Sequence, residues 1–173
     1  MINSILNRKT PVMFKKILLF LLLVFIVIQF FHPKANKSGG DQPNYIGKSF
    51  SIPDDVKSIL QKACTDCHSN NTRYPWYSNI QPVDWWLSNH IKDGKVELNF
   101  DEYTNRSLRY QYHKMEEMVE QVKEGEMPLN SYTWIHKEAK LKDEEKNKLI
   151  EWANGVMDAM KAKYAIDSLI RKK

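Results

Sequence analysis

Cysteine is nearly absent from the sequence, which has only two in 173 residues. These two, Cys64 and Cys67, lie three positions apart, so no other cysteine remains for a disulfide framework or for a second pair of zinc ligands. The thiol chemistry of the chain is therefore confined to one short segment.

Acidic residues are missing from residues 1–40. That stretch holds six basic residues: Arg8, Lys9, Lys15, Lys16, Lys34 and Lys37. Without these six, 20 basic residues face 21 acidic ones, so residues 41–173 carry a net charge of about −1 and the overall +5 belongs to the N-terminal segment. Binding of nucleic acid requires cations gathered on the folded domain. We therefore expect no nucleic-acid partner.

Polar residues are absent from residues 17–28, an unbroken apolar run that Phe30 and Phe31 extend. A basic flank followed by such a run is typical of a secretory signal or a signal anchor. We favour an uncleaved transmembrane anchor at residues 14–31 after a cytoplasmic tail at residues 1–13, with a cleaved signal as the alternative. The chain would then be a single-pass protein of the bacterial inner membrane, with its folded domain on the periplasmic side.

The segments on either side of the expected domain have the composition of connectors. Proline, glycine and serine are concentrated in residues 32–46, which predicts a flexible linker. Residues 165–173 end in a basic cluster and are expected to form a tail. Residues 47–164 remain as the expected folded domain.

Alternating apolar and polar residues, the pattern of a β-strand, are lacking in this domain. Apolar residues instead recur with helical spacing in four segments, and Gly94 and Gly125 follow two of them as expected helix ends. The expected helices are residues 53–63, 83–93, 105–124 and 143–163. The predicted fold class is all-α, and the long loops between the helices suggest that something other than side chains fills the core.

Residues 64–68 read Cys-Thr-Asp-Cys-His, the C-x-x-C-H pattern of a c-type haem attachment site. Two thiols three positions apart can bond to the two vinyl groups of one haem, and the histidine that follows can reach the iron. We therefore predict one covalent haem c per chain, held by Cys64, Cys67 and His68 and attached by the cytochrome c maturation machinery outside the cytoplasm.

Three other uses of the cysteine pair fit the sequence less well. A redox dithiol follows a strand in an α/β fold, which is not expected here. A zinc site needs two further clustered ligands. A disulfide across so short a loop would be strained.

Four residues could supply a second ligand to the iron: Met127, His90, His113 and His136. We predict Met127, because it stands on a constrained loop between a helix stop and a proline and has no helical stripe to join. His90 is the alternative, although its place on an apolar helix face also suits an ordinary core imidazole. His113 lies away from the apolar stripe of its helix, and His136 lies in a polar loop. An open sixth position is a further alternative.

Aromatic residues are dense just after the motif. Trp76 and Trp86 could pack on the porphyrin and exclude water, and Arg73 could pair with a haem propionate. The plainer alternative is that the aromatic side chains belong to an ordinary core and that Arg73 is a solvated loop residue.

Taken together, these motifs resemble the bacterial haem-binding domain family of the cytochrome c superfamily. The resemblance covers about residues 48–155 and is carried by residues 64–78, Trp85-Trp86, Asn89-His90-Ile91, Gly94, residues 98–100, residues 125–129, Tyr132, His136 and Trp152. It implies a cytochrome-c-like small helical domain around one haem, with His68 and Met127 as the iron ligands.

Electron transfer is the function that these features predict, between a redox donor and an acceptor that the sequence does not name. A haem-based sensor or ligand-binding module is the alternative, and it requires a displaceable sixth ligand. An enzyme is not expected, because no distal His/Arg pair of the peroxidase kind stands out.

Overall fold

The computed structural model describes residues 12–170, and within that range every regular element is a helix. This confirms the predicted all-α class. The chain divides into two compact units. One unit combines the residues up to 35 with residues 74–88, and the other combines residues 36–73 with those from 89 onward.

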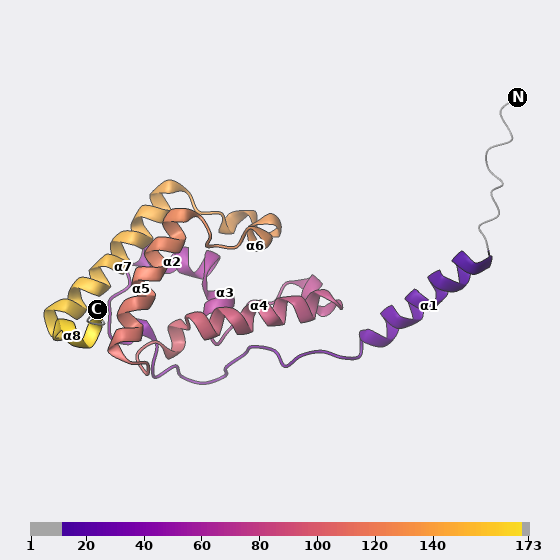
Figure 1. Ribbon diagram of the computed structural model, residues 1–173, viewed down its shortest axis with the longest axis horizontal. Coiled ribbons are helices and arrows are strands. Elements are labelled where there is room, and N and C mark those ends of the chain that lie inside the picture. Colours follow the sequence, from indigo (N-terminus) through magenta and orange to yellow (C-terminus); the bar gives the residue numbers. More distant parts are fainter. Residues whose placement is uncertain (1–11, 171–173) are drawn as a thin grey trace, which may run out of the picture. The chain divides into compact units, whose positions relative to one another are not determined.

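The first unit contains α1 (Val12–Ile28), a 17-residue helix (Figure 1). Its side chains from Val12 to Val27 are all exposed. We expected this helix to continue to residue 31, but it ends at Ile28. The amides of residues 29–31 bond three positions back rather than four, which tightens the chain into a turn before Pro33. Within residues 12–170, no helix has both the length and the apolar character needed to cross a bilayer.

The residues just after α1 are bonded to the segment that precedes and opens α4 (Val83–Glu97). The Gln81 side-chain amide donates to the Phe31 carbonyl at 2.7 Å, and the Trp85 indole donates to the same carbonyl at 2.8 Å. His32 Nδ1 lies 2.7 Å from an Asp84 carboxylate oxygen. These bonds satisfy polar groups at the end of an otherwise apolar segment.

The predicted flexible linker is wrong for residues 36–46, which belong to the second unit. Ser38 N donates to Asn70 O and Thr72 N donates to Asn36 O, both at 3.0 Å, and Ile46 is fully buried. The backbone groups of this segment find partners in the loop after the C-x-x-C-H motif, so the segment is ordered against the domain.

The core of the second unit lies among α2 (Asp54–Ala63), α5 (Leu108–Glu124) and α7 (Asp143–Lys163). Helices α5 and α7 lie side by side and run in opposite directions (Figure 1). Fully buried side chains of both helices, Met115 and Leu149 among them, form the centre of this core.

Three of the four expected helices end where the sequence predicted. The segments predicted at 53–63 and 143–163 are α2 and α7, and α5 ends at Gly125, whose φ of 76° is the left-handed cap that glycine favours. Helix α5 begins three residues later than expected, because the Ser107 hydroxyl accepts from Tyr110 N and caps it there.

Helix α4 does not stop at Gly94 as expected but continues to Glu97. A Cβ at Gly94 would lie 3.0 Å from the Cys67 carbonyl oxygen and 3.1 Å from Cys67 Cβ. Glycine is therefore needed here for close approach of α4 to the cysteine segment, not as a helix stop.

The predicted C-terminal tail is wrong for residues 165–170, because α8 (Ile166–Leu169) packs its Leu169 into the core. Residues 171–173 and nearly all of the predicted cytoplasmic tail lie outside the described residues. The remaining short helices are η1 (Ile46–Lys48), α3 (Thr65–His68), η2 (Trp76–Asn79), η3 (Phe100–Glu102), α6 (Asn130–Ile135) and η4 (Lys137–Ala139).

Candidate functional site

The C-x-x-C-H segment forms a single helical turn at the end of α2. Cys64 N donates to Leu60 O at 2.9 Å as α2 ends, and His68 N donates to Cys64 O at 2.9 Å across α3. This turn holds both cysteines and His68 within one short stretch. Both thiols are free, so the cysteines do not form a disulfide.

The environment of the thiols is the opposite of the one that activates a redox dithiol. Burial raises the pKa of Cys64 to about 12, and burial together with the nearby Asp66 carboxylate raises the pKa of Cys67 to about 11. Reactive cysteines have lowered pKa values, because the thiolate is the nucleophile. Within residues 12–170, no group of three or more His, Cys, Asp or Glu side chains could hold a metal ion. The structure therefore gives no support to the dithiol and zinc alternatives.

His68 is oriented as a metal ligand. Its Nδ1 lies 2.9 Å from the Leu98 carbonyl oxygen, which can only accept, so Nδ1 carries the proton. The lone pair of Nε2 is then available, and a ligating histidine is usually held in this way by a bond from its other nitrogen. Burial lowers the pKa of His68, which favours the neutral imidazole that binds metal.

A cavity of about 370 Å³ opens beside this turn. Its volume lies in the range typical of cofactor and ligand sites, roughly 300–1,000 Å³. Its lining residues are Cys64, His68, Glu97, Leu98, Phe100, Lys114, Glu117, Met118, Glu120, Gln121, Val122 and Met127. The cavity combines a thiol, an imidazole and two thioethers with apolar walls, a set of groups suited to an iron porphyrin.

Met127, the predicted second iron ligand, lines this cavity together with His68. Its binding to iron stays a prediction. Met127 is half-buried and follows the Gly125 cap, and its backbone N donates to Gln121 O at 3.2 Å. A second, smaller cavity of about 30 Å³ is also lined by Met127 together with both cysteines and His68.

Met118 of α5 also lines the main cavity, and the sequence analysis did not single it out. Met118 lies three residues after Met115 and four before Val122, so it continues the apolar stripe of α5. This spacing would have allowed the sequence to predict that Met118 faces the core.

The three histidines considered as alternative iron ligands, His90, His113 and His136, line neither cavity. His90 is half-buried on α4, and His113 is ion-paired at the surface with Glu116 and Glu117. His136 stacks on the Tyr132 ring, with centroids 4.5 Å apart.

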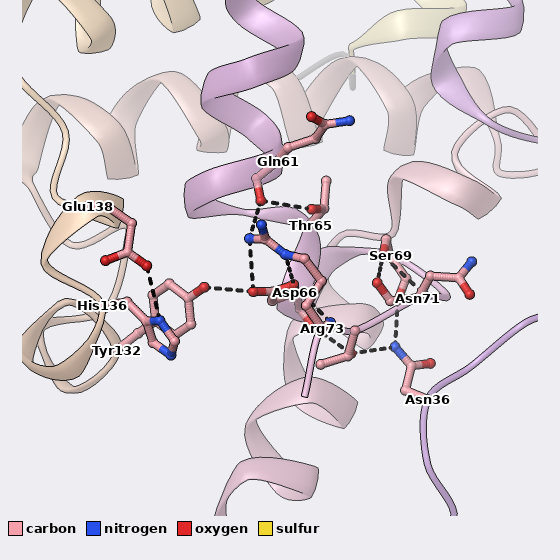
Figure 2. Close-up of polar contacts among 11 residues, drawn as sticks. Asn36, Gln61, Thr65, Asp66, Ser69, Asn71, Arg73, Tyr132, His136 and Glu138 are labelled. Atoms are coloured by element: carbon pink, nitrogen blue, oxygen red, sulfur yellow. Dashed lines mark hydrogen bonds and ion pairs between the residues drawn. The ribbon is translucent and has the colours of Figure 1, made fainter. Parts of the chain in front are cut away.

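Arg73, which we predicted to pair with a haem propionate, forms an ion pair with Asp66 instead (Figure 2). Its Nε and Nη2 donate to the two Asp66 oxygens at 3.1 and 3.2 Å, and Nη2 also donates to Gln61 O at 2.6 Å. Arg73 does not line the cavity, and its pairing with a haem propionate stays a prediction. Lys114 is the cation that lines the cavity, ion-paired with Glu97 and Glu117.

Trp76 and Trp86 belong to the first unit, where they are 78% and 45% exposed. Their packing on haem stays a prediction. The sequence analysis named Asp66 only within the motif and Tyr132 only within the family resemblance, and gave neither of them a role. The carboxylate between the two cysteines was the signal that could have indicated one for Asp66.

Comparison with curated proteins and with solved structures gave no match. A family model described as a haem-binding domain matches residues 23–155, well over half of the chain. That span contains the C-x-x-C-H turn, the cavity beside it and Met127. Haem is therefore the cofactor to which the site corresponds, and the chain belongs to the haem-binding domain family.

Proposed function

We propose that the protein is a c-type monohaem cytochrome of the cytochrome c superfamily that transfers electrons. The observation that carries this proposal is the shared cavity. One helical turn presents Cys64 and a correctly oriented His68, with Cys67 beside them, and a methionine on a separate loop lines the same space.

Cys64 and Cys67 would attach the haem covalently. Each thiol would add across one vinyl group, which would form a carbon–sulfur bond and leave the thiol hydrogen on the other vinyl carbon. No oxidant or leaving group is needed. The spacing within one turn brings two thiols to one porphyrin, and the desolvated thiols have no competing role as nucleophiles.

His68 and Met127 would hold the iron, His68 through Nε2 and Met127 through its thioether sulfur. The Leu98 carbonyl accepts from His68 Nδ1 and so fixes the ring, which would leave the lone pair of Nε2 for the iron and lower the entropy lost on binding it. Bound haem supplies an iron that alternates between the ferric and ferrous states. A Met/His ligand pair raises the reduction potential of haem relative to two histidines. The apolar side chains of Phe100 and Val122 line the cavity and would keep water from the iron.

A haem-based sensor is the second candidate, and one observation favours it. Met127 is only half-buried and stands on a loop, so a small molecule could displace it from the iron. Met118, on a rigid helix of the same cavity, offers a second thioether.

We also propose that the domain works on the outer face of the bacterial inner membrane, where the maturation machinery attaches haem. The basic residues of the N-terminal segment support this, as do the exposed apolar side chains around all of α1. From Ile17 to Ile28, after Lys15 and Lys16, α1 is apolar on every side, and such a surface requires an apolar environment.

The test is expression with a working maturation system, followed by mass spectrometry and absorption spectroscopy. We expect the mass of one haem, retained after denaturation, and the weak long-wavelength band of iron–methionine bonding in the oxidised protein. Met127→Ala should abolish that band, and the matched variant Met118→Ala should keep it. A folded, colourless product would refute the proposal, and a band lost only in Met118→Ala would reassign the ligand.

A further inference from the structure

Asp66, between the two cysteines of the motif, is a buried carboxylate with four hydrogen bonds. It accepts from Arg73 N, Nε and Nη2 and from the Tyr132 hydroxyl, which lies 2.7 Å away. A buried charge is costly unless it is paired and hydrogen-bonded, so the partners of Asp66 are required for the motif to fold in this way.

The two partners come from different parts of the chain. Arg73 follows Asp66 by seven residues and closes a local loop, whereas Tyr132 is 66 residues away on α6. Figure 2 shows the Tyr132 hydroxyl reaching Asp66 from the side opposite to the loop that carries Asn36. The Tyr132 bond therefore joins the haem-attachment turn to a distant helix.

Helix α6 starts three residues after Met127, so Tyr132 controls one end of the Met127 loop. The other end is held by the Gly125 cap, through bonds from Glu126 N and Met127 N to Gln121 O. Met127, Asp66 and Tyr132 line one small cavity, so the Tyr132–Asp66 bond and the Met127 side chain share the same wall.

The Tyr132 ring is itself fixed in place. It stacks on His136 with an angle of 23° between the rings, and His136 Nδ1 lies 3.2 Å from Glu138. Because the ring is fixed, its bond to Asp66 also fixes the start of α6, and with it the end of the loop that carries Met127. Burial and the Asp66 carboxylate raise the pKa of Tyr132, which keeps its hydroxyl as the donor.

We propose that Asp66 and Tyr132 form a clamp that holds the Met127 loop over the haem iron, which makes Tyr132 a positioning residue for the sixth ligand. This inference rests on the proposed function, since it concerns the ligand of the same iron. Loss of the clamp lets the loop open and exposes the sixth position to added ligands.

The experiment titrates the oxidised holoprotein with imidazole, which competes with Met127, and follows haem absorption. Tyr132→Phe keeps the ring but removes the bond to a charged acceptor, so the apparent imidazole affinity should rise at least about tenfold. Asp66→Asn should raise it in the same direction. In the double variant the combined effect should be smaller than the sum of the two, because both variants act on the Tyr132–Asp66 bond. Asp66→Asn also weakens the bonds from Arg73, so its own effect should be the larger of the two.

Tyr103→Phe is the matched control. It removes an equally short bond, from a fully buried tyrosine hydroxyl to Gln111 O at 2.6 Å, at a site that does not line the cavity. It should lower stability and leave imidazole affinity unchanged. Imidazole affinity in Tyr132→Phe equal to that of the parent would overturn the clamp while leaving the cytochrome proposal intact.

Two further outcomes are decisive. A parent protein that binds imidazole as tightly as Met127→Ala does would refute both the sixth-ligand assignment and the clamp. A protein without haem would refute the proposed function itself, and mass spectrometry recognises that case before any titration.

Discussion

The two sides of the cavity are built in different ways. On the cysteine side, the motif is one helical turn whose position is set by α2, by the Gly94 contact and by the His68–Leu98 bond. On the methionine side, a half-buried side chain stands on a loop between a glycine cap and a short helix. The comparison teaches that the cysteine turn is held by several contacts, both local ones at the end of α2 and long-range ones to Gly94 and Leu98. The Met127 loop is held by fewer contacts, the bonds to Gln121 O before it and the Tyr132–Asp66 bond after it.

The largest effect is expected on the cysteine side. In Cys64→Ala/Cys67→Ala no thioether can form, so no haem should remain with the chain after denaturation. Mass spectrometry and haem staining of denaturing gels measure this directly. Met127→Ala is the contrasting variant and should retain its haem fully. Equal loss of haem in both variants would erase the difference between the two sides.

The second largest effect is expected when the proposed iron ligand Met127 is removed. Met127→Ala should lower the reduction potential by a fraction of the roughly 0.8 V range that axial ligands command, since a thioether favours the ferrous state. Redox titration followed by haem absorption measures the shift. Met118→Ala, in the same cavity, should change the potential much less, and the reverse order would assign Met118 as the ligand.

A smaller effect is expected where α4 meets the cysteine turn. Gly94→Val should destabilise the protein by about 1–3 kcal/mol, because its side chain would overlap Cys67. Gly155 is the matched control: it also lies inside a helix, and a Cβ there meets nothing within 4 Å. Gly155→Val should stay within about 0.5 kcal/mol of the parent. Chemical unfolding followed by circular dichroism gives both values.

The smallest effect is a pH dependence of the haem-free protein. Burial lowers the pKa of His68 in the folded state, so the unfolded chain takes up the proton first as the pH falls. The contribution of neutral His68 to the free energy of unfolding is therefore complete above the unfolded-state pKa of about 6.5. Below that value the free energy of unfolding falls by at most about 1.4 kcal/mol per pH unit.

Urea unfolding between pH 7 and pH 5 tests this dependence. His68→Gln should flatten the curve over that interval. Holoprotein should also show a flatter curve, because Nε2 is then occupied by iron. An unchanged slope in His68→Gln would assign the dependence to another group.

The local parts of this protein follow from the sequence by itself. The C-x-x-C-H turn, helices α2 and α7 and the Gly125 cap depend on groups a few residues apart, and their spacing and helical periodicity are written in the chain. The loop position of Met127 also follows from the sequence, because this methionine stands between a helix stop and a proline; its role as an iron ligand stays a prediction.

Only the tertiary structure decided the rest. It showed that Gly94 allows a close contact rather than ending a helix, that Arg73 pairs with Asp66, and that residues 36–46 dock on the domain. It also brought Tyr132 to Asp66 across 66 residues. A hydrogen-bond partner so far along the chain is chosen by how helices pack, and no pattern within a few residues can encode that choice.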